Sequence, residues 1–463
     1  MPNTGRWPPV FSNIVSWCES TFHLGDVRRS RALGEMAWGL MNSQLVSFAA
    51  IGRKMKSDAS AASSITRTFK WCHNKHIKPL VVQEALLVEF VEEAVFNLAD
   101  RRVATVALDW HSYDNGRISS LRVSLMTGSR ALPLYWLHCL TSELGGQRNK
   151  LERKAVRFLR RIQPLGVTWL MLLDAGFVTP ELIPLLDDTG CYIVRTSCTM
   201  KVHAGCGCWV SAGDLPIRVG EVVEFGWLHR GKHNTETARL VAGRIYAQPP
   251  VQRGLRSTIR KYKNTKPGLC LLSTNLPCEV ADAATVIQLY GRRFEIEHSF
   301  RDLKNATLGM DMEHVHLDDI STYDRLMCIV AVAEALLWMV GAEAEALGLH
   351  RRLSPSQPRD ASRRVLSLRN VGVEMLKYID RSVRTLIRTR LLPAIRDVVR
   401  ITGATWKRLT TRSRMKGLIT ERSKLGKAPD KKGVRCARRP ECAQPIVIEL
   451  AAEAEPACLG QAA

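Results

Sequence analysis

The pattern of apolar and polar residues predicts a sheet in the first half of the chain. Residues 103–108 form an apolar, β-branched run that ends at Asp109. Residues 117–125 and 131–139 alternate apolar and polar side chains, and Gly-containing turns separate the three runs. Such runs with short turns between them predict three antiparallel strands.

A helix, a strand, a second helix and a short strand are predicted after these three strands. Apolar residues at helical spacing predict a helix over 151–162, and the other face of this helix is basic. Residues 167–173 form a nearly continuous apolar run, typical of a fully buried strand, and this run ends at Asp174. Pro180 marks a second helix start, and 192–196 is a short strand. This order predicts an α/β fold with a ribonuclease-H-like core.

The predicted core is interrupted before its last helix. Residues 198–267 are Gly-rich and contain short alternating runs, such as 222–225 and 239–242, which predict a mostly β insertion. An apolar run at 269–276 brings the chain back to the core.

Residues 290–304, with the sequence YGRRFEIEHSFRDLK, predict an amphipathic helix because apolar residues are spread through them and Pro is absent. Polar residues recur at offsets 0, 3, 7 and 14, which at about 100° per residue fall on one stripe roughly 60° wide. The stripe holds Tyr290, Arg293, Glu297 and Lys304, with Arg301 at its edge. A carboxylate among cations suits the binding of a phosphodiester beside a metal ion. A solvated face with ion pairs explains the same charges, so spacing alone does not decide.

Helical patterns precede the core. Residues 26–41, 47–55 and 59–72 are predicted helices, and the third carries Arg67 and Lys70. A helix, a short turn and a basic helix indicate a helix-turn-helix-like DNA-binding module. A plain helical bundle remains the alternative.

Three further segments complete the pattern. The first 25 residues are polar and contain Pro, so we expect loose order, and 81–98 is predicted to be a helix leading into the core. The most apolar segment, 327–339, is interrupted by Glu334 and is too short to span a bilayer, which predicts a buried core helix.

The chain therefore divides into four predicted parts. They are a helical DNA-binding domain (1–98), a ribonuclease-H-like catalytic domain (99–349) with the β insertion at about 198–267, a basic helical C-terminal region (350–440) and a disordered tail (441–463).

Charge adds information about partners. The 463 residues carry a formal net charge of +23, which favours a polyanionic partner, either nucleic acid or an acidic membrane surface. Residues 401–439 contain thirteen Lys or Arg and two acids, Glu421 and Asp430, a net of +11. The thirteen scattered cysteines and the lack of a recognisable N-terminal signal indicate free thiols in a reducing cytosol. We see no Gly-rich nucleotide loop, so no nucleotide cofactor is implied.

The spacing Y-x2-R-x3-E-x6-K is the signature of transposases of the insertion-sequence-four family, the group that includes the transposon-five transposase. The chain resembles this family at every signature position. The resemblance implies that Glu297 is the last member of an Asp-Asp-Glu metal triad whose other members are Asp109 and Asp174. Residues 174–177 (DAGF) fit the family's usual Asp-x-Gly-Phe pattern. Asp109 departs from it, because Trp110-His111 follows where many relatives carry small hydroxyl residues; Asp114, in a turn, is the alternative.

The resemblance also implies a mechanism and partners. The enzyme is expected to bind insertion-sequence ends and to catalyse 3′-end cleavage and strand transfer in cut-and-paste transposition. Two Mg²⁺ ions, about 3.5–4 Å apart, would be held by the triad, and Mn²⁺ would substitute. A homodimer in a synaptic complex on double-stranded DNA is expected, in the bacterial cytoplasm and associated with the nucleoid through DNA, with no membrane partner. The DNA contacts are assigned to Tyr290, Arg293, Arg301 and Lys304.

Several alternatives remain open at this point. A domesticated transposase that binds DNA without cutting, or a ribonuclease-H-like nuclease or resolvase, would share parts of the pattern. Trp209 and Trp227 of the insertion are candidates for base stacking or for core positions. A zinc site is a weaker reading than buried thiols, because only three candidate ligands occur: His203, Cys206 and Cys208.

Overall fold

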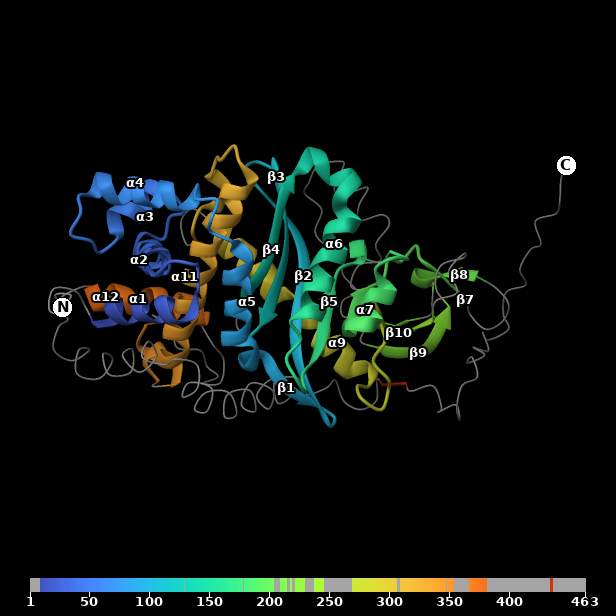
Figure 1. Ribbon diagram of the computed structural model, residues 1–463. Helices are drawn as coiled ribbons and strands as arrows, with labels where there is room; N and C mark the ends of the chain where they lie inside the picture. Colours follow the sequence, from blue (N-terminus) through green and yellow to red (C-terminus); the bar gives the residue numbers. More distant parts are fainter. Residues whose placement is uncertain are drawn as a thin grey trace, which may run out of the picture. The chain divides into compact units, whose positions relative to one another are not determined.

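The computed structural model describes residues 9–128, 130–177, 179–203, 209–214, 217–218, 221–229, 237–244, 269–305, 309–346, 348–353, 366–380 and 434–435 (Figure 1). The chain forms two compact units. The first comprises Met1–Tyr192 and Leu289–Lys427, and the second comprises Ile193–Gln288 and Ala428–Ala463. The predicted basic run at 401–439, apart from 434–435, and the predicted tail lie outside the described residues.

The sheet of the first unit contains the predicted meander. β2 (Arg101–Tyr113), β3 (Ile118–Met126) and β4 (Ala131–Leu140) pair antiparallel in chain order. β5 (Thr168–Leu173) pairs parallel with the other edge of β2, and β6 (Gly190–Arg195) follows β5 in the strand order. These pairings confirm a mixed α/β core, and their order is consistent with the predicted ribonuclease-H-like arrangement.

Helices cover this sheet. α5 (Pro79–Phe90) packs on β4, and α6 (Leu144–Arg161) packs on β3, β4 and α7 (Ile183–Thr189) (Figure 1). α6 buries Ala155, Val156, Phe158 and Leu159 and leaves its basic face in solvent. This division of faces is the one that its periodicity predicts.

The flanking helices of the first unit pack together. α2 (Val27–Ser43) contacts α3 (Phe48–Lys54), which contacts α4 (Ala61–Cys72). Side-chain oxygens of Asp26, Ser47 and Ser60 accept hydrogen bonds from the amides of the first turns, which explains where each helix begins. The three predicted helices are confirmed. α1 (Pro9–Thr21), α11 (Ile320–Ala346) and α12 (Leu368–Asp380) pack against α2 or one another (Figure 1).

Two expectations near the N-terminus are wrong. α1 buries Ile14, Trp17 and Cys18 at helical spacing, so this segment belongs to the core instead of being loosely ordered. The helix predicted over 81–98 ends at Phe90, and β1 (Val95–Leu98) pairs with the start of β2. Pairing with β2 therefore determines the conformation of residues 95–98.

α11 is the apolar helix predicted around 327–339. It has 27 residues and is long and apolar enough to cross a membrane, but 94% of its most apolar window is buried within the unit. Gly341 approaches the Leu368 carbonyl of α12 so closely that a Cβ would lie 1.7 Å from the oxygen. This close packing makes α11 a core helix.

Glu334 is buried in α11 beside an arginine of α12. The Arg369 Nε donates to Glu334 Oε1 at 2.7 Å, and the two side chains are 1% and 3% exposed. Arg369 also donates to Oε1 of Gln44, the residue that caps the C-terminal end of α2, at 3.0 Å. One ion pair therefore ties three helices together and accounts for the charge that interrupts the apolar segment.

The second unit is mostly strand in its described part. β9 (Val222–His229), β10 (Thr237–Arg244) and β11 (Leu269–Thr274) pair antiparallel in that order, and β11 pairs with the end of β6. β12 (Val434–Arg435) pairs with β9. β7 (Lys201–His203) and β8 (Trp209–Ser211) form a separate hairpin.

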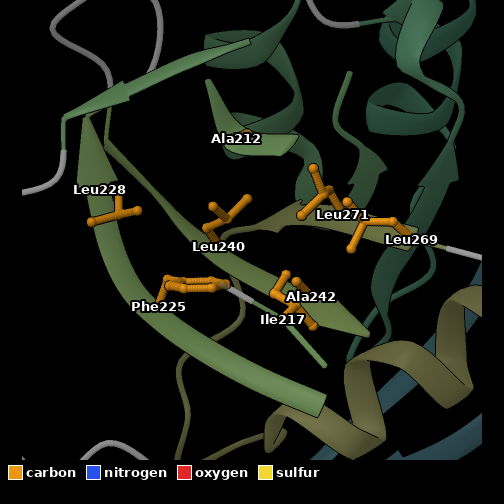
Figure 2. Packing of buried hydrophobic residues seen from close by; sticks show 8 residues of the cluster. All are labelled: Ala212, Ile217, Phe225, Leu228, Leu240, Ala242, Leu269 and Leu271. Carbon is orange, nitrogen blue, oxygen red and sulfur yellow. The ribbon is translucent and has the colours of Figure 1, made fainter. Parts of the chain in front are cut away.

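A bulge shapes the core of this unit. Gly226, with φ of +72°, lies where the β9–β10 register shifts. Phe225 and Leu228 are three residues apart, so regular alternation would place them on opposite faces. The extra residue of the bulge brings both to the inner face, where the cluster also contains Ala212, Ile217, Leu240, Ala242, Leu269 and Leu271 (Figure 2).

Short 3₁₀ helices connect several elements. They are Val91–Ala94, Thr141–Glu143, Ala175–Phe177, Ala212–Asp214, Met312–His314 and Leu349–Arg352.

Candidate active site

Two of the predicted acids lie side by side at one edge of the first unit's sheet. The last parallel pair between β2 and β5 is Leu108↔Leu173, and Asp109 and Asp174 follow immediately. β2 does not end at Asp109, as the apolar run suggested, because β3 continues to pair with it as far as Tyr113. β5 ends at Leu173 while β2 continues, so Asp109 lies where the parallel pairing with β5 stops.

The third acid comes from α10 (Phe294–Lys304), which follows α9 (Ala283–Gly291). The single helix predicted over 290–304 is wrong. The amides of Arg292 and Arg293 donate to carbonyls three residues back, at 3.1 and 2.9 Å, so the chain tightens to a 3₁₀-like turn between the two helices. The calculated stripe therefore does not extend across this turn.

Arg293 nevertheless brings the three acids together. Its guanidinium lies 2.8 Å from Asp109 Oδ2, 3.9 Å from Asp174 Oδ2 and 2.6 Å from Glu297 Oε1. The Arg293 side chain is only 10% exposed. A single buried cation thus contacts carboxylates from β2, from the end of β5 and from α10.

Burial changes the electrostatics of this cluster. Burial raises the pKa of Asp109 to about 6, although Arg293 opposes the rise; Asp174 and Glu297 add to it. The three acids hold the pKa of Arg293 above its usual value despite burial. Among the residues that the structure describes, buried Asp174 Oδ1 has no hydrogen-bond partner. The cluster has more negative charge than one guanidinium neutralises, and one acceptor is free for another ligand.

Asp109→Asn should stabilise the protein at neutral pH when EDTA is present. A raised pKa means that the folded state binds this proton more tightly than the unfolded chain. The stability that this group contributes is therefore fully present below the usual pKa of 3.8 and is lost as pH rises through about 6. The amide cannot ionise and avoids that loss. Melting temperatures of both proteins between pH 4 and 8 should therefore coincide near pH 4 and separate above pH 6. If the difference between the two melting temperatures grew as pH fell, the expected direction of the effect would be wrong.

The two residues after Asp109 bind helices on opposite faces of β2. Trp110 Nε1 donates to Glu152 Oε1 of α6 at 2.8 Å. The His111 ring stacks on Phe300 of α10, with centroids 4.2 Å apart. Burial lowers the pKa of His111 to about 3, with Lys304 and Arg122 contributing, so the ring is neutral. The Trp-His departure from the family pattern thus helps to place both helices around the acid.

The remaining predicted DNA-contact residues lie at different distances from the triad. The Tyr290 hydroxyl donates to the Leu173 carbonyl at 3.3 Å, directly beside Asp174. Lys304 lies 2.7 Å from Glu313 Oε2, at the other end of α10. Arg301 is exposed on α10. Only Tyr290 and Arg293 of the four are brought to the carboxylates.

The alternative acid, Asp114, has a turn role. It adopts a φ of +54° and its carboxylate pairs with Arg117 and His316. Hydrogen bonds from those two side chains lower the pKa of Asp114, although burial opposes them. These contacts account for Asp114 without a catalytic role.

The candidates in the insertion stay predictions. Trp227 on β9 is 47% exposed and Trp209 on β8 is half-buried. Cys206 and Cys208 lie outside the described residues.

A residue pair that the sequence patterns did not single out lies beside the site. Arg148 Nε donates to Glu152 Oε1 at 2.9 Å, and its guanidinium lies 5.6 Å from the Trp110 ring centroid. Glu152 is fully buried. The sequence does contain a signal for this pair, because an acid follows an arginine by four residues on an otherwise basic helix.

The triad supplies the type of donor that divalent metal ions prefer. Carboxylate oxygens are the hard ligands of Mg²⁺, and within the described part of the chain Asp174 Oδ1 is a buried acceptor without a partner. Within the described ranges, no three His, Cys, Asp or Glu side chains stand close enough together to hold a metal. In the triad, the Arg293 guanidinium lies between the acids and sets their spacing.

A mixed sheet that places two acids at one edge, with a third acid on a neighbouring helix, is consistent with a ribonuclease-H-like enzyme that acts on phosphodiester bonds. Comparison with protein families supports this class: the model of the transposase DDE domain matches residues 100–331, about half of the chain, and the chain belongs to this family. No curated protein matches the chain.

Membership of this family has direct consequences. DDE transposases cleave phosphodiester bonds and join DNA strands by transesterification in DNA transposition. They bind DNA and generally use divalent metals. The expectation of a DDE transposase is thus confirmed at the level of the family.

Proposed function

We propose that the protein is a cut-and-paste transposase of the insertion-sequence-four type. The observation that carries this proposal is the contact of Arg293 with Asp109, Asp174 and Glu297. It supports the assignment of these acids as one triad, and Arg293 and Glu297 are both signature residues. The similarity to the transposon-five transposase is part of this proposal.

The three acids would hold Mg²⁺, with Mn²⁺ as a substitute. Bound metal ions would activate the attacking oxygen and stabilise negative charge on the leaving oxygen. The first reaction is attack by water on the phosphodiester at the transposon end; the P–O bond to the 3′ oxygen breaks and leaves a 3′-hydroxyl. That hydroxyl then attacks a target phosphodiester, forming one P–O bond as another breaks, so no covalent enzyme intermediate is needed.

Arg293 would change partners during this cycle. Its guanidinium binds two of the carboxylates at 2.6–2.8 Å, and a DNA phosphate at the site would compete with them for these donors. Phosphate would compete with Glu313 for Lys304 in the same way. We propose that these exchanges couple DNA binding to assembly of the site.

Basic residues outside the active site would also bind DNA. The basic run at 401–439 and the N-terminal helices are proposed to supply most of the sequence-independent affinity. A homodimer that holds two transposon ends is the proposed active form.

The function can be tested with the purified protein and a labelled duplex that carries the inverted repeat flanking its gene. Incubation with Mg²⁺ should release a 3′-hydroxyl at the repeat boundary, and added plasmid should become covalently joined to that end. Binding without cutting would instead indicate a domesticated DNA-binding protein. Cutting without joining would indicate a nuclease.

Arg293→Ala and Lys304→Ala should each weaken end binding and cleavage together. Loss of one phosphate contact should reduce the slope of log affinity against log salt by about 1. Arg102→Ala is the matched control, because Arg102 is exposed and pairs with Glu92. Gel shifts at several salt concentrations and single-turnover cleavage measure both effects. Wild-type binding and cleavage in both variants would refute the DNA-contact assignment.

A further inference from the structure

Arg148 is held in place by a buried acid. Glu152 has no exposed surface, and its Oε1 accepts hydrogen bonds from Arg148 Nε at 2.9 Å and Trp110 Nε1 at 2.8 Å. A buried carboxylate is unfavourable unless charged or polar partners compensate it. Arg148 and Trp110 are such partners, so the three side chains form a fixed group.

The free end of Arg148 points to the loop after Asp174. A Cβ on Gly176 would lie 2.8 Å from an Arg148 terminal nitrogen, so the guanidinium lies against the backbone two residues past the acid. The Arg148 side chain is 42% exposed. Glu152 accepts a hydrogen bond only from Nε of Arg148. In the part of the chain that the structure describes, the two terminal nitrogens of Arg148 have no hydrogen-bond partner.

The triad edge therefore has a cation on each face of the sheet. Arg293 contacts the acids from the α10 side, where His111 also stacks. Arg148 lies on the α6 side with Trp110. A DNA strand whose scissile phosphate sits at the acids continues to either side of them, so a neighbouring phosphate can reach the face on which Arg148 lies.

We propose that Arg148 binds a DNA phosphate next to the scissile one, and that Glu152 and Trp110 position it for that contact. The inference rests on the proposed function for the place of the scissile phosphate. Arginine suits this role because its planar guanidinium can bind phosphate with two parallel hydrogen bonds while Nε remains on Glu152.

The test uses the full-length protein and the inverted-repeat duplex, with single methylphosphonates placed at each phosphate flanking the cleavage position. Binding is measured in EDTA. For the wild type, one flanking methylphosphonate should weaken binding by about tenfold, because a charge-assisted hydrogen bond is lost. In Arg148→Ala, binding should be weakened already, and that methylphosphonate should have no further effect.

Cleavage provides the second measurement. Arg148→Ala should slow single-turnover cleavage by about 100-fold, and Arg148→Lys should recover part of that loss. Arg157→Ala removes the same charge from the exposed face of α6 and should leave the rate near that of the wild type. Gly176→Ala should push the nearby terminal nitrogen of Arg148 out of position and slow cleavage, but it should add nothing to Arg148→Ala.

The outcomes separate the two proposals. If the wild type fails to cut while the methylphosphonate effect still depends on Arg148, the phosphate contact stands and the proposed function fails. If the wild type cuts but Arg148→Ala binds every methylphosphonate duplex as the wild type does, the contact is refuted. Equal cleavage rates for Arg148→Ala and Arg157→Ala would refute it as well.

Discussion

Asp109→Asn, Asp174→Asn and Glu297→Gln should each reduce end cleavage and strand transfer by about 1,000-fold or more. An amide keeps the size of the side chain and removes the charge that would hold a divalent metal. All three acids contact the same guanidinium, so loss of any one disrupts a single constellation.

End binding should survive these changes. Each variant keeps two acids to neutralise Arg293, so no buried cation is left unpaired. Cleavage of a labelled end duplex in Mg²⁺, beside a gel shift in EDTA, measures both properties. Asp188→Asn is the matched control, because Asp188 lies exposed on α7 and pairs weakly with Arg160 at 3.4 Å. If Glu297→Gln cuts at the wild-type rate, the triad assignment fails.

Arg369→Ala should lower the free energy of unfolding of the first unit by about 3–5 kcal/mol, because it leaves the buried Glu334 carboxylate without its cation. The same substitution removes the hydrogen bond to Gln44 and the link among three helices. Thermal and urea unfolding, followed by tryptophan fluorescence, measure the loss.

A double variant separates charge from packing. Glu334→Leu with Arg369→Met should recover much of the stability, because apolar side chains of similar volume replace a buried pair with little loss. Lys377→Ala on α12 breaks an exposed pair with Glu374 and should change stability by less than about 1 kcal/mol. Equal losses for Lys377→Ala and Arg369→Ala would show that the buried pair has no special contribution.

The catalytic strands could be predicted because their pattern is local. An apolar run that ends in an acid appears twice, at Asp109 and Asp174, and buried parallel strands bring such ends to one edge. The parallel register Leu108↔Leu173 agrees with that reading. The sequence could not show that β2 continues, because β3 supplies the pairing that extends it.

The turn between α9 and α10 depends on contacts distant in sequence. Arg292 donates to Thr105 Oγ1 at 3.2 Å and to the Met126 carbonyl at 2.7 Å, and Arg293 binds the acids. Helical periodicity contains no information about these partners, so a continuous helix was the simplest prediction. The signature spacing still placed Arg293 and Glu297 near each other, because Arg293 is the N-cap of α10 and Glu297 lies one turn further along that helix.

The alternation along β2 limits how this gene can change. Trp110 contacts α6 and His111 contacts α10, so one residue inserted before Asp109 would exchange their faces and turn the acid away from Arg293. Insertions and deletions within β2 should therefore be selected against among functional copies, whereas a substitution changes one position and leaves the faces of its neighbours unchanged.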